Sequence, residues 1–297
     1  MIILKFGGSS IKDSSHIKNV YSIIHSKVKN DNIAIVFSAM GGITNKLIKL
    51  AGKAKNREDY EFDLNNLKSV HQNCMDELQL IGTSVKLDKC FKNLKIDLSN
   101  IFKKNHLSDK LIDKVLSYGE ILSTTIIADY LNFQNIPSEQ LITNNIIITD
   151  NNFGNAYVHF QKSFNKIKNY FKEHKKTQII TGFIGSTEEG EITTLGRNGS
   201  DYTATLFGTA LNANSIEIWS DVNGVLSTNP NFTKEARAIP YLTYEEAMEL
   251  AHAGAEILFP PSIIPVLYKN IPIKIKNTLN PKHPGAVIIN KKKSSDS

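Results

Sequence analysis

A lysine beside two glycines is the first feature of this sequence that suggests chemistry. Lys5 lies near the end of an apolar run, and Gly7 and Gly8 follow it closely. Glycines let backbone amides approach an anion, and the lysine adds a positive charge, so this combination favours phosphate binding. Ordinary tight turns use paired glycines too, so the feature is a weak signal by itself.

A second group of polar residues precedes a helix predicted from Tyr202 toward Leu211. The group consists of Arg197, Ser200 and Asp201. The 35 basic residues of the chain include only three arginines, so we expect Arg197 to have a geometric role, the two-bonded clamp on a carboxylate. We expect Ser200 to cap the helix and Asp201 to lie in its first turn.

Short apolar runs and helical periodicity predict the elements that must position these residues. Strand, glycine turn and helix follow one another twice at the start of the chain, an order typical of a parallel sheet with ligands at the carboxyl ends of its strands. The predicted strands are 2–6, 33–37, 146–149, 178–181, 215–219 and, as the last, 271–276, with 191–195 as a hairpin arm. The predicted helices begin near 17 and span 43–54, 155–174 and 243–253, and residues 57–134 form a helical region.

Composition argues against several other classes of protein. The net charge is +6, but the lysines are scattered among asparagines and acidic residues, so a nucleic-acid partner is not expected. No stretch of 18 apolar residues and no signal peptide occur, and no membrane partner is expected. Cys74 and Cys90 belong to no metal-binding pattern, so we expect no zinc, no disulfide and a cytoplasmic location.

Four motifs, in this order and at these spacings, resemble those of the aspartokinases. They are KFGGSS at 5–10, FSAMGGITNKL at 37–47, SYGE at 117–120 and TTLGRNGSDY at 193–202. The resemblance continues through EIWSDVNGV at 217–225, EEAMELAHAGAEIL at 245–258 and IKNTLNPKHPGAVI at 275–288. It therefore spans nearly the whole chain, and it looks closest to the kinase portion of the bifunctional aspartokinase/homoserine dehydrogenases.

The resemblance implies the amino acid kinase fold, a three-layer αβα sandwich around a mainly parallel sheet. It also implies transfer of a phosphoryl group from ATP, with Mg²⁺, to the side-chain carboxylate of L-aspartate. Phosphoryl transfer to a carboxylate mostly requires alignment and charge neutralisation, for which Lys, Arg and glycine amides are suitable. By the same resemblance, Lys5 would stabilise the transferring phosphoryl group and Asp201 would organise that lysine. The acceptor pocket would consist of Ser38, Thr44, Glu120, Phe183, Arg197 and Ser200, with Glu120 facing the amino group and Arg197 a carboxylate.

The nucleotide-binding residues implied by the resemblance include several that depart from the family's pattern. The whole implied nucleotide-binding set is Gly7, Gly8, Ser9, Ser220, Asp221, Leu226 and Asn231. Leu226, Asn229 and Asn231 replace the usual Tyr, Asp and Arg, and Glu256 and Phe259 replace the usual Lys and His. A glutamate near phosphates would repel them, unless it turns to solvent or Lys274 or Lys276 supplies the lost charge.

The expected organisation is one amino acid kinase domain at 1–290, followed by a polar tail at 291–297 and no ACT regulatory domain. An acceptor lobe would span about 1–190 and a nucleotide lobe about 191–290, and a homodimer is one expectation for the assembly. Two alternatives to an aspartate kinase stay open. One is a divergent carboxylate or amino acid kinase with another acceptor or donor, and the other is a pseudokinase that binds aspartate or a partner protein without turnover.

Overall fold

A computed structural model describes residues 1–80, 84–226, 238–252, 258 and 260–290. The helices of this part of the chain are α1 (Ser14–Val28), α2 (Ile43–Lys55), α3 (Glu61–Glu77), α4 (Ser84–Lys104), α5 (Asp109–Phe133), α6 (Phe160–Glu173), α7 (Gly199–Ala210), α8 (Tyr244–His252) and α9 (Pro260–Leu267). Two 3-10 helices, η1 (Gly8–Ile11) and η2 (Thr143–Asn145), lie between them. No helix in these ranges is both long enough and apolar enough to cross a membrane.

The central sheet has eight strands in the order β10-β12-β11-β7-β1-β2-β4-β3. Their bounds are β1 (Ile2–Phe6), β2 (Ile33–Phe37), β3 (Ser138–Leu141), β4 (Thr177–Thr181), β7 (Ser215–Ser220), β10 (Tyr241–Thr243), β11 (Ile273–Asn277) and β12 (Ala286–Ile289). Every pairing in this sheet is parallel except β11 with β12. This confirms the predicted α/β class with a mainly parallel sheet.

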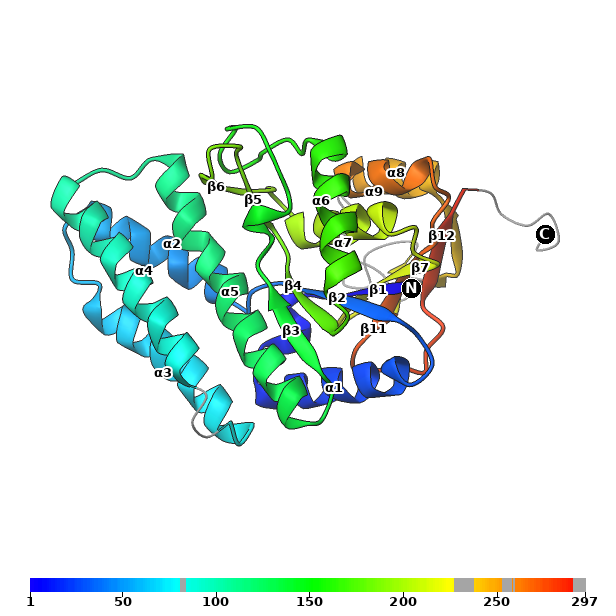
Figure 1. Ribbon diagram of the computed structural model, residues 1–297, viewed down its shortest axis with the longest axis horizontal. Coiled ribbons are helices and arrows are strands. Elements are labelled where there is room, and N and C mark those ends of the chain that lie inside the picture. The colour runs from blue at the N-terminus through cyan, green and yellow to red at the C-terminus, as the bar shows by residue number, and fades with distance from the viewer. Residues whose placement is uncertain (81–83, 227–237, 253–257, 259, 291–297) are drawn as a thin grey trace.

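Helices cover both faces of the sheet and make the two outer layers of the sandwich, as Figure 1 shows. Successive side chains of a strand point to opposite faces, and β1 follows this rule. Leu4 and Phe6 belong to a core with α1, α2 and α5, whereas Ile3 belongs to a second core with α6, α7 and α9. The alternation therefore directs Lys5 to the α7 face, where Ile3 also lies.

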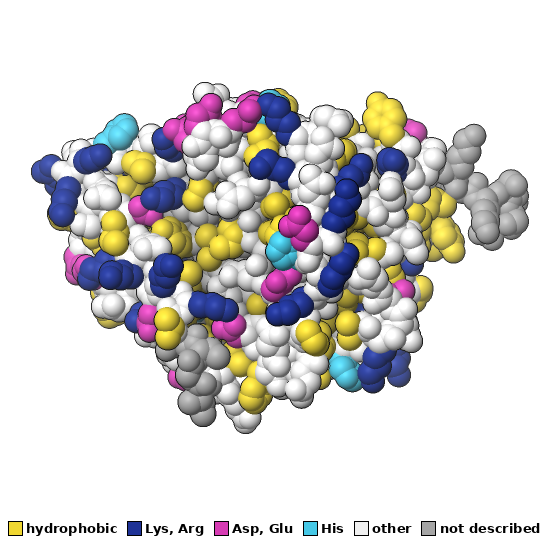
Figure 2. All heavy atoms as spheres, viewed as in Figure 1, with side chains coloured by type: hydrophobic (Ala, Val, Ile, Leu, Met, Phe, Trp, Pro, Cys, Tyr) yellow, Lys and Arg dark blue, Asp and Glu magenta, His cyan; other side chains and the backbone are white. Residues whose placement is uncertain are grey.

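Residues 57–134 form the predicted helical region, which extends away from the sheet as α3, α4 and the first half of α5 (Figure 1). Helix α2 contacts α3, α4 and α5, so this region packs on the helix that follows the second glycine turn. Lys and Arg side chains are spread among Asp and Glu side chains over the face seen in Figure 2.

The structure corrects three of the predicted elements. Residues 146–149 are not a strand of the sheet: Ile148 and Thr149 make isolated bridges to Ser186 and Val158, although the apolar side chains of the run are buried. Helix α6 begins at Phe160 instead of 155, because Ala156 and Tyr157 hydrogen bond through their amides to Thr194 and Asp150. Strand β11 is not the last, since β12 follows it.

The remaining strands form two small antiparallel pairs separate from the central sheet. Strands β5 (Ile184–Ser186) and β6 (Ile192–Thr194) pair with each other, which confirms the predicted hairpin arm. Strands β8 (Val225–Leu226) and β9 (Ala238–Ile239) form the second pair.

Candidate active site

A buried ion pair stands at the carboxyl end of β1. The Lys5 ammonium lies 2.7 Å from Asp201 Oδ1, and both side chains are about one-tenth exposed. Asp201 lies in the first turn of α7, as predicted, so a residue 196 positions away in the chain is brought to the lysine. The contact lacks hydrogen-bond geometry, so Asp201 Oδ1 is a buried oxygen with no hydrogen-bond donor among the described residues.

The first glycine turn wraps closely around the end of this lysine. A Cβ on Gly7 would lie 3.5 Å from Lys5 Nζ, and a Cβ on Gly8 would lie 2.8 Å from the Ala39 carbonyl oxygen. Gly8 must therefore be glycine, because the turns after β1 and β2 touch there. The predicted phosphate turn and Lys5 are thus brought together, and Ser9, in the same turn, is exposed.

The second glycine turn starts α2 beside the first. Gly42 is the residue before the helix and has φ of 78°, a left-handed conformation that favours glycine. Thr44 lies in the first helical turn and is half-buried. Ser38, at the end of β2, is held by its amide, which donates to the Phe6 carbonyl oxygen at 3.2 Å.

Glu120 of α5 reaches into the same end of the sheet. Its Oε1 accepts a hydrogen bond from the Ala39 amide at 3.1 Å, while Oε2 is buried with no hydrogen-bond partner in the described structure. Gly119 makes this reach feasible, since a Cβ there would lie 2.8 Å from Ala39 Cβ. Burial raises the pKa of Glu120 to about 8, and the nearby positive charge of Lys5 acts in the opposite direction. An ammonium group is the partner that would satisfy the unpartnered oxygen and favour the carboxylate form.

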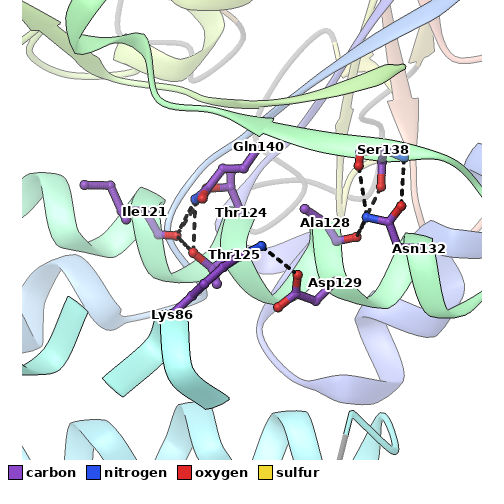
Figure 3. Close-up of polar contacts among 9 residues, drawn as sticks. All are labelled: Lys86, Ile121, Thr124, Thr125, Ala128, Asp129, Asn132, Ser138 and Gln140. Carbon is purple, nitrogen blue, oxygen red and sulfur yellow. Dashed lines mark hydrogen bonds and ion pairs between the residues drawn. The ribbon is translucent and has the colours of Figure 1, made fainter. Parts of the chain in front are cut away.

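Helix α5, which carries Glu120, is fixed to the edge strand β3 by side-chain bonds. Gln140 Nε2 donates to the Ile121 carbonyl at 2.9 Å and to the hydroxyls of Thr124 and Thr125 at 2.8 and 3.1 Å (Figure 3). Further along the helix, Asn132 donates to the Ser138 carbonyl at 2.9 Å (Figure 3). The sequence analysis missed β3 because Ser138–Leu141 is mostly polar, and its polar side chains are used for this docking.

The loop from β4 to α7 brings in the other predicted acceptor residues. Phe183 has φ of 69°, an uncommon conformation for a bulky residue, and its amide donates to Thr203 Oγ1 at 3.0 Å. Ser200 is buried against Gly182, where an added Cβ would lie 2.4 Å from the hydroxyl. The prediction that Ser200 caps α7 is wrong, because Asn198 occupies the capping position in a left-handed conformation and Ser200 lies inside the helix. Arg197, one residue earlier, is exposed on this loop.

The predicted nucleotide residues are only partly within the described structure. Ser220 ends β7, and its carbonyl accepts hydrogen bonds from the Thr278 amide at 2.8 Å and hydroxyl at 2.9 Å. Asp221 is exposed, and the backbone of Leu226 lies in β8. Four further positions at which the sequence departs from the aspartokinase pattern lie outside the described residues: Asn229, Asn231, Glu256 and Phe259.

Two side chains of this region were not singled out from the sequence. Thr203 holds Phe183 through the bond described above, and its hydroxyl donates to the Gly199 carbonyl at 3.0 Å. Thr278 joins Ser220 to the first glycine turn, since its hydroxyl lies 3.1 Å from that of Ser10. Thr278 lies within the motif at 275–288 and directly after β11, and these are the sequence signals that could have identified it.

Among the residues that the structure describes, no group of three or more His, Cys, Asp or Glu side chains could hold a metal ion. The Asp201 carboxylate, whose Oδ1 is ion-paired with Lys5 but accepts no hydrogen bond from the described residues, fits the oxygen preference of Mg²⁺, an ion that commonly binds through one or two carboxylates, water and substrate phosphates.

Comparison with known proteins places this arrangement in one family. The model of the amino acid kinase family matches residues 1–277. Aspartokinase 1 of Arabidopsis thaliana is 36% identical over 96% of this chain and 51% of its own length. The bifunctional aspartokinase/homoserine dehydrogenase of Buchnera aphidicola is 33% identical over 97% of this chain and 36% of its own length. The chain thus spans about half the length, or less, of these curated relatives.

Solved structures agree with the sequence relatives. Escherichia coli aspartokinase III in complex with aspartate and ADP superposes with a TM-score of 0.89 at 27% identity, covering 99% of this chain and 65% of that one. Clostridium acetobutylicum aspartate kinase gives 0.84 at 29% identity, covering all of this chain and 65% of the other. The buried lysine, the paired glycine turns and the fold therefore occur together in a chain that belongs to the amino acid kinase family.

Proposed function

We propose that this chain is an aspartate kinase that transfers the γ-phosphoryl group of ATP to the side-chain carboxylate of L-aspartate. The observation that carries the proposal is the Lys5–Asp201 pair, which lies beside the first glycine turn and near enough to the buried Glu120 for the charge of Lys5 to act on it. A lysine and backbone amides suit a phosphate, and an unpartnered carboxylate oxygen suits the amino group of an acceptor. The aspartokinases among the relatives support the choice of aspartate.

The proposed reaction is a direct displacement. An oxygen of the aspartate side-chain carboxylate attacks the γ-phosphorus, the bond from that phosphorus to the bridging oxygen breaks, and ADP leaves with the electron pair. Lys5 neutralises charge on the phosphoryl oxygens, Asp201 holds the lysine in place, and Glu120 fixes the amino group. Magnesium would neutralise phosphate charge, with Asp201 as the protein oxygen suited to it.

In this proposal the chain divides its work between two lobes. The acceptor lobe, about 1–190, supplies Ser38, Thr44, Glu120 and Phe183, and the nucleotide lobe, about 191–290, supplies Ser220, Asp221, Leu226 and Asn231. Arg197 and Ser200, at the boundary, complete the acceptor pocket. We expect the protein to work in the cytoplasm, where thiols such as those of Cys74 and Cys90 stay reduced. A homodimer is the expected assembly.

A hydroxamate assay tests the proposal directly. Purified protein is incubated with L-aspartate, MgATP and hydroxylamine, which traps an acyl phosphate as the hydroxamate. We expect ATP-dependent hydroxamate from the wild type and a loss of about 100-fold or more in Lys5→Met. No product from folded wild-type protein would contradict an aspartate kinase.

The same samples separate the two alternatives. A kinase with another acceptor would give hydroxamate from a different carboxylate in a panel of amino acids, with far less from aspartate. A pseudokinase would bind aspartate in calorimetry but not MgATP. If the wild type were inactive and Glu256→Lys gained activity, the lost MgATP binding would be attributed to position 256 of the nucleotide lobe.

A further inference from the structure

A cavity of about 530 Å³ opens on the face of the sheet opposite Lys5. One wall is the side of α1 that carries Asn19, Ser22 and Ser26, one helical turn apart in sequence. The floor is Trp219 of β7 and Lys276 of β11, which are directly paired in the register of the two strands. None of these residues belongs to the proposed active site, so the cavity needs its own explanation.

One of the two lysines of the cavity is already neutralised. Lys27 Nζ lies 2.6 Å from Glu217 Oε1, and the Glu217 side chain is only 2% exposed. The other carboxylate oxygen, Oε2, accepts a hydrogen bond from Trp219 Nε1 at 3.1 Å. Glu217 is therefore fully occupied beneath the cavity, and its charge is balanced by Lys27.

The second lysine has no such partner. Lys276 Nζ lies 5.4 Å from the centre of the Trp219 ring, a cation–π contact, and no carboxylate of the described residues is within ion-pair distance of it. Burial lowers the pKa of Lys276, whereas the charge of Glu217 acts in the opposite direction. A partly buried ammonium without an ion-pair partner among the described residues lies at the base of an open cavity, an arrangement that favours an anionic ligand.

The remaining lining determines what kind of anion fits. Ile23 is apolar and buried, and Leu279 presents an apolar side chain that is 59% exposed. Asn19 adds an amide donor. The cavity volume is in the range of sites for small organic ligands, which are mostly apolar with a few placed polar groups.

We propose that this cavity is a second ligand site, which binds a small organic carboxylate through Lys276 and packs its apolar body against Trp219, Ile23 and Leu279. A single negative charge matches the single unpaired ammonium of the lining. Inorganic phosphate fits less well for two reasons. A dianion would face only one unpaired cation, and phosphate has no apolar part to pack against Trp219, Ile23 and Leu279.

The site is separate from the active site but joined to it by one residue. Lys5 and Asp201 lie on the α7 face, and the cavity lies on the α1 face. Thr278 lines the cavity, and its hydroxyl contacts Ser10 of the first glycine turn as well as the Ser220 carbonyl. A ligand beside Thr278 is thus one contact away from the proposed phosphate turn.

The sequence supplies a direct probe, since Trp219 is the only tryptophan. Benzoate, as the probe carboxylate, is titrated against the full chain while tryptophan fluorescence is recorded, with benzamide as a neutral isostere and inorganic phosphate as a second arm. We expect a saturable change with benzoate and at least tenfold weaker binding of benzamide and phosphate. Lys276→Met should weaken benzoate binding at least tenfold.

Two further variants make the test decisive. Lys274→Met removes a charge two residues away on the same strand and outside the lining, so it should change benzoate affinity less than threefold. Ser22→Phe, at an exposed position of α1, should block the cavity without disturbing the fold, as its circular dichroism would verify. Saturable benzoate binding that survives both Lys276→Met and Ser22→Phe would overturn the proposal. So would the absence of saturable binding, tighter binding of phosphate, or full displacement of benzoate by MgATP.

Discussion

At the scale of single residues, substitutions in the Lys5–Asp201 pair should affect stability and catalysis differently. Removing either partner leaves a buried charge, so Lys5→Met and Asp201→Asn should each lower the free energy of unfolding by about 3–5 kcal/mol. The double variant has no unpaired charge and should recover at least half of that loss. Its kcat for hydroxamate formation should nevertheless stay about 100-fold or more below the wild type, because the phosphoryl charge is no longer neutralised.

Urea unfolding measures the first quantity and the hydroxamate assay the second. A purely structural pair would give a double variant that regains both stability and turnover. That result would remove Lys5 from the proposed chemistry.

Glu120 should give the protein a pH dependence of a definite sign. Its pKa is raised from 4.5 to about 8, so the folded state binds a proton that the unfolded state releases near 4.5. Stability from this group is fully present below about pH 4.5 and is lost as the pH rises through about 8. Relative to Glu120→Gln, the wild type should lose a few kcal/mol of unfolding free energy over this window.

Aspartate binding should strengthen as the pH rises, whereas the stability of the fold should fall. Because an ammonium group pairs with the ionised carboxylate, the KM for aspartate should fall as the pH rises towards and through 8. In Glu120→Gln the KM should be higher and lose this dependence. A wild-type KM profile identical in shape to that of Glu120→Gln would contradict the assignment of Glu120 to the amino group.

At the scale of elements, apolar runs located most of the strands that carry the site. Strands β1, β2, β4 and β7 are almost entirely buried and each contains at least two adjacent or alternating apolar residues, and the sequence predicted all four. The polar strand β3 was missed and the apolar run 146–149 was placed wrongly, for one reason: hydrophobicity reports burial, and only tertiary packing decides whether the backbone joins the sheet. Residue types alone could not pair Lys5 with Asp201, which depends on how α7 crosses β1, and only the resemblance suggested it.

The docking of α5 on β3 should contribute measurable stability. Gln140→Met removes donors from one carbonyl and two hydroxyls, so it should lower the free energy of unfolding by about 1–3 kcal/mol in urea titrations. Lys86→Met is the matched control, because Lys86 is 68% exposed and its 3.3 Å ion pair with Asp129 should contribute less than about 1 kcal/mol (Figure 3). Equal effects of the two substitutions would contradict a special role for Gln140.

At the scale of the whole molecule, one sheet runs through both proposed lobes. Strand β1, from the acceptor side, pairs with β2 on one edge and with β7, from the nucleotide side, on the other. Parallel order places the carboxyl ends of all three strands at one edge, which is why glycine turns, Lys5 and Ser220 could be expected to meet there. The order of the outer strands was beyond prediction, because β12, antiparallel to β11 and parallel to β10, inserts between these two strands.

Because one continuous sheet runs through both proposed lobes, a ligand bound to the chain should stabilise both lobes against unfolding. Aspartate at 100 times its Kd should stabilise the folded chain by about 2.7 kcal/mol. Because β1 and β7 share a full register, Trp219 fluorescence on the nucleotide side and circular dichroism of the whole chain should report the same rise in Tm. Succinate, which lacks the amino group that Glu120 would bind, should raise Tm much less at the same concentration. If aspartate raised the transition seen by circular dichroism and left the Trp219 transition unchanged, the lobes would unfold independently, and the shared register of β1 and β7 would not couple them.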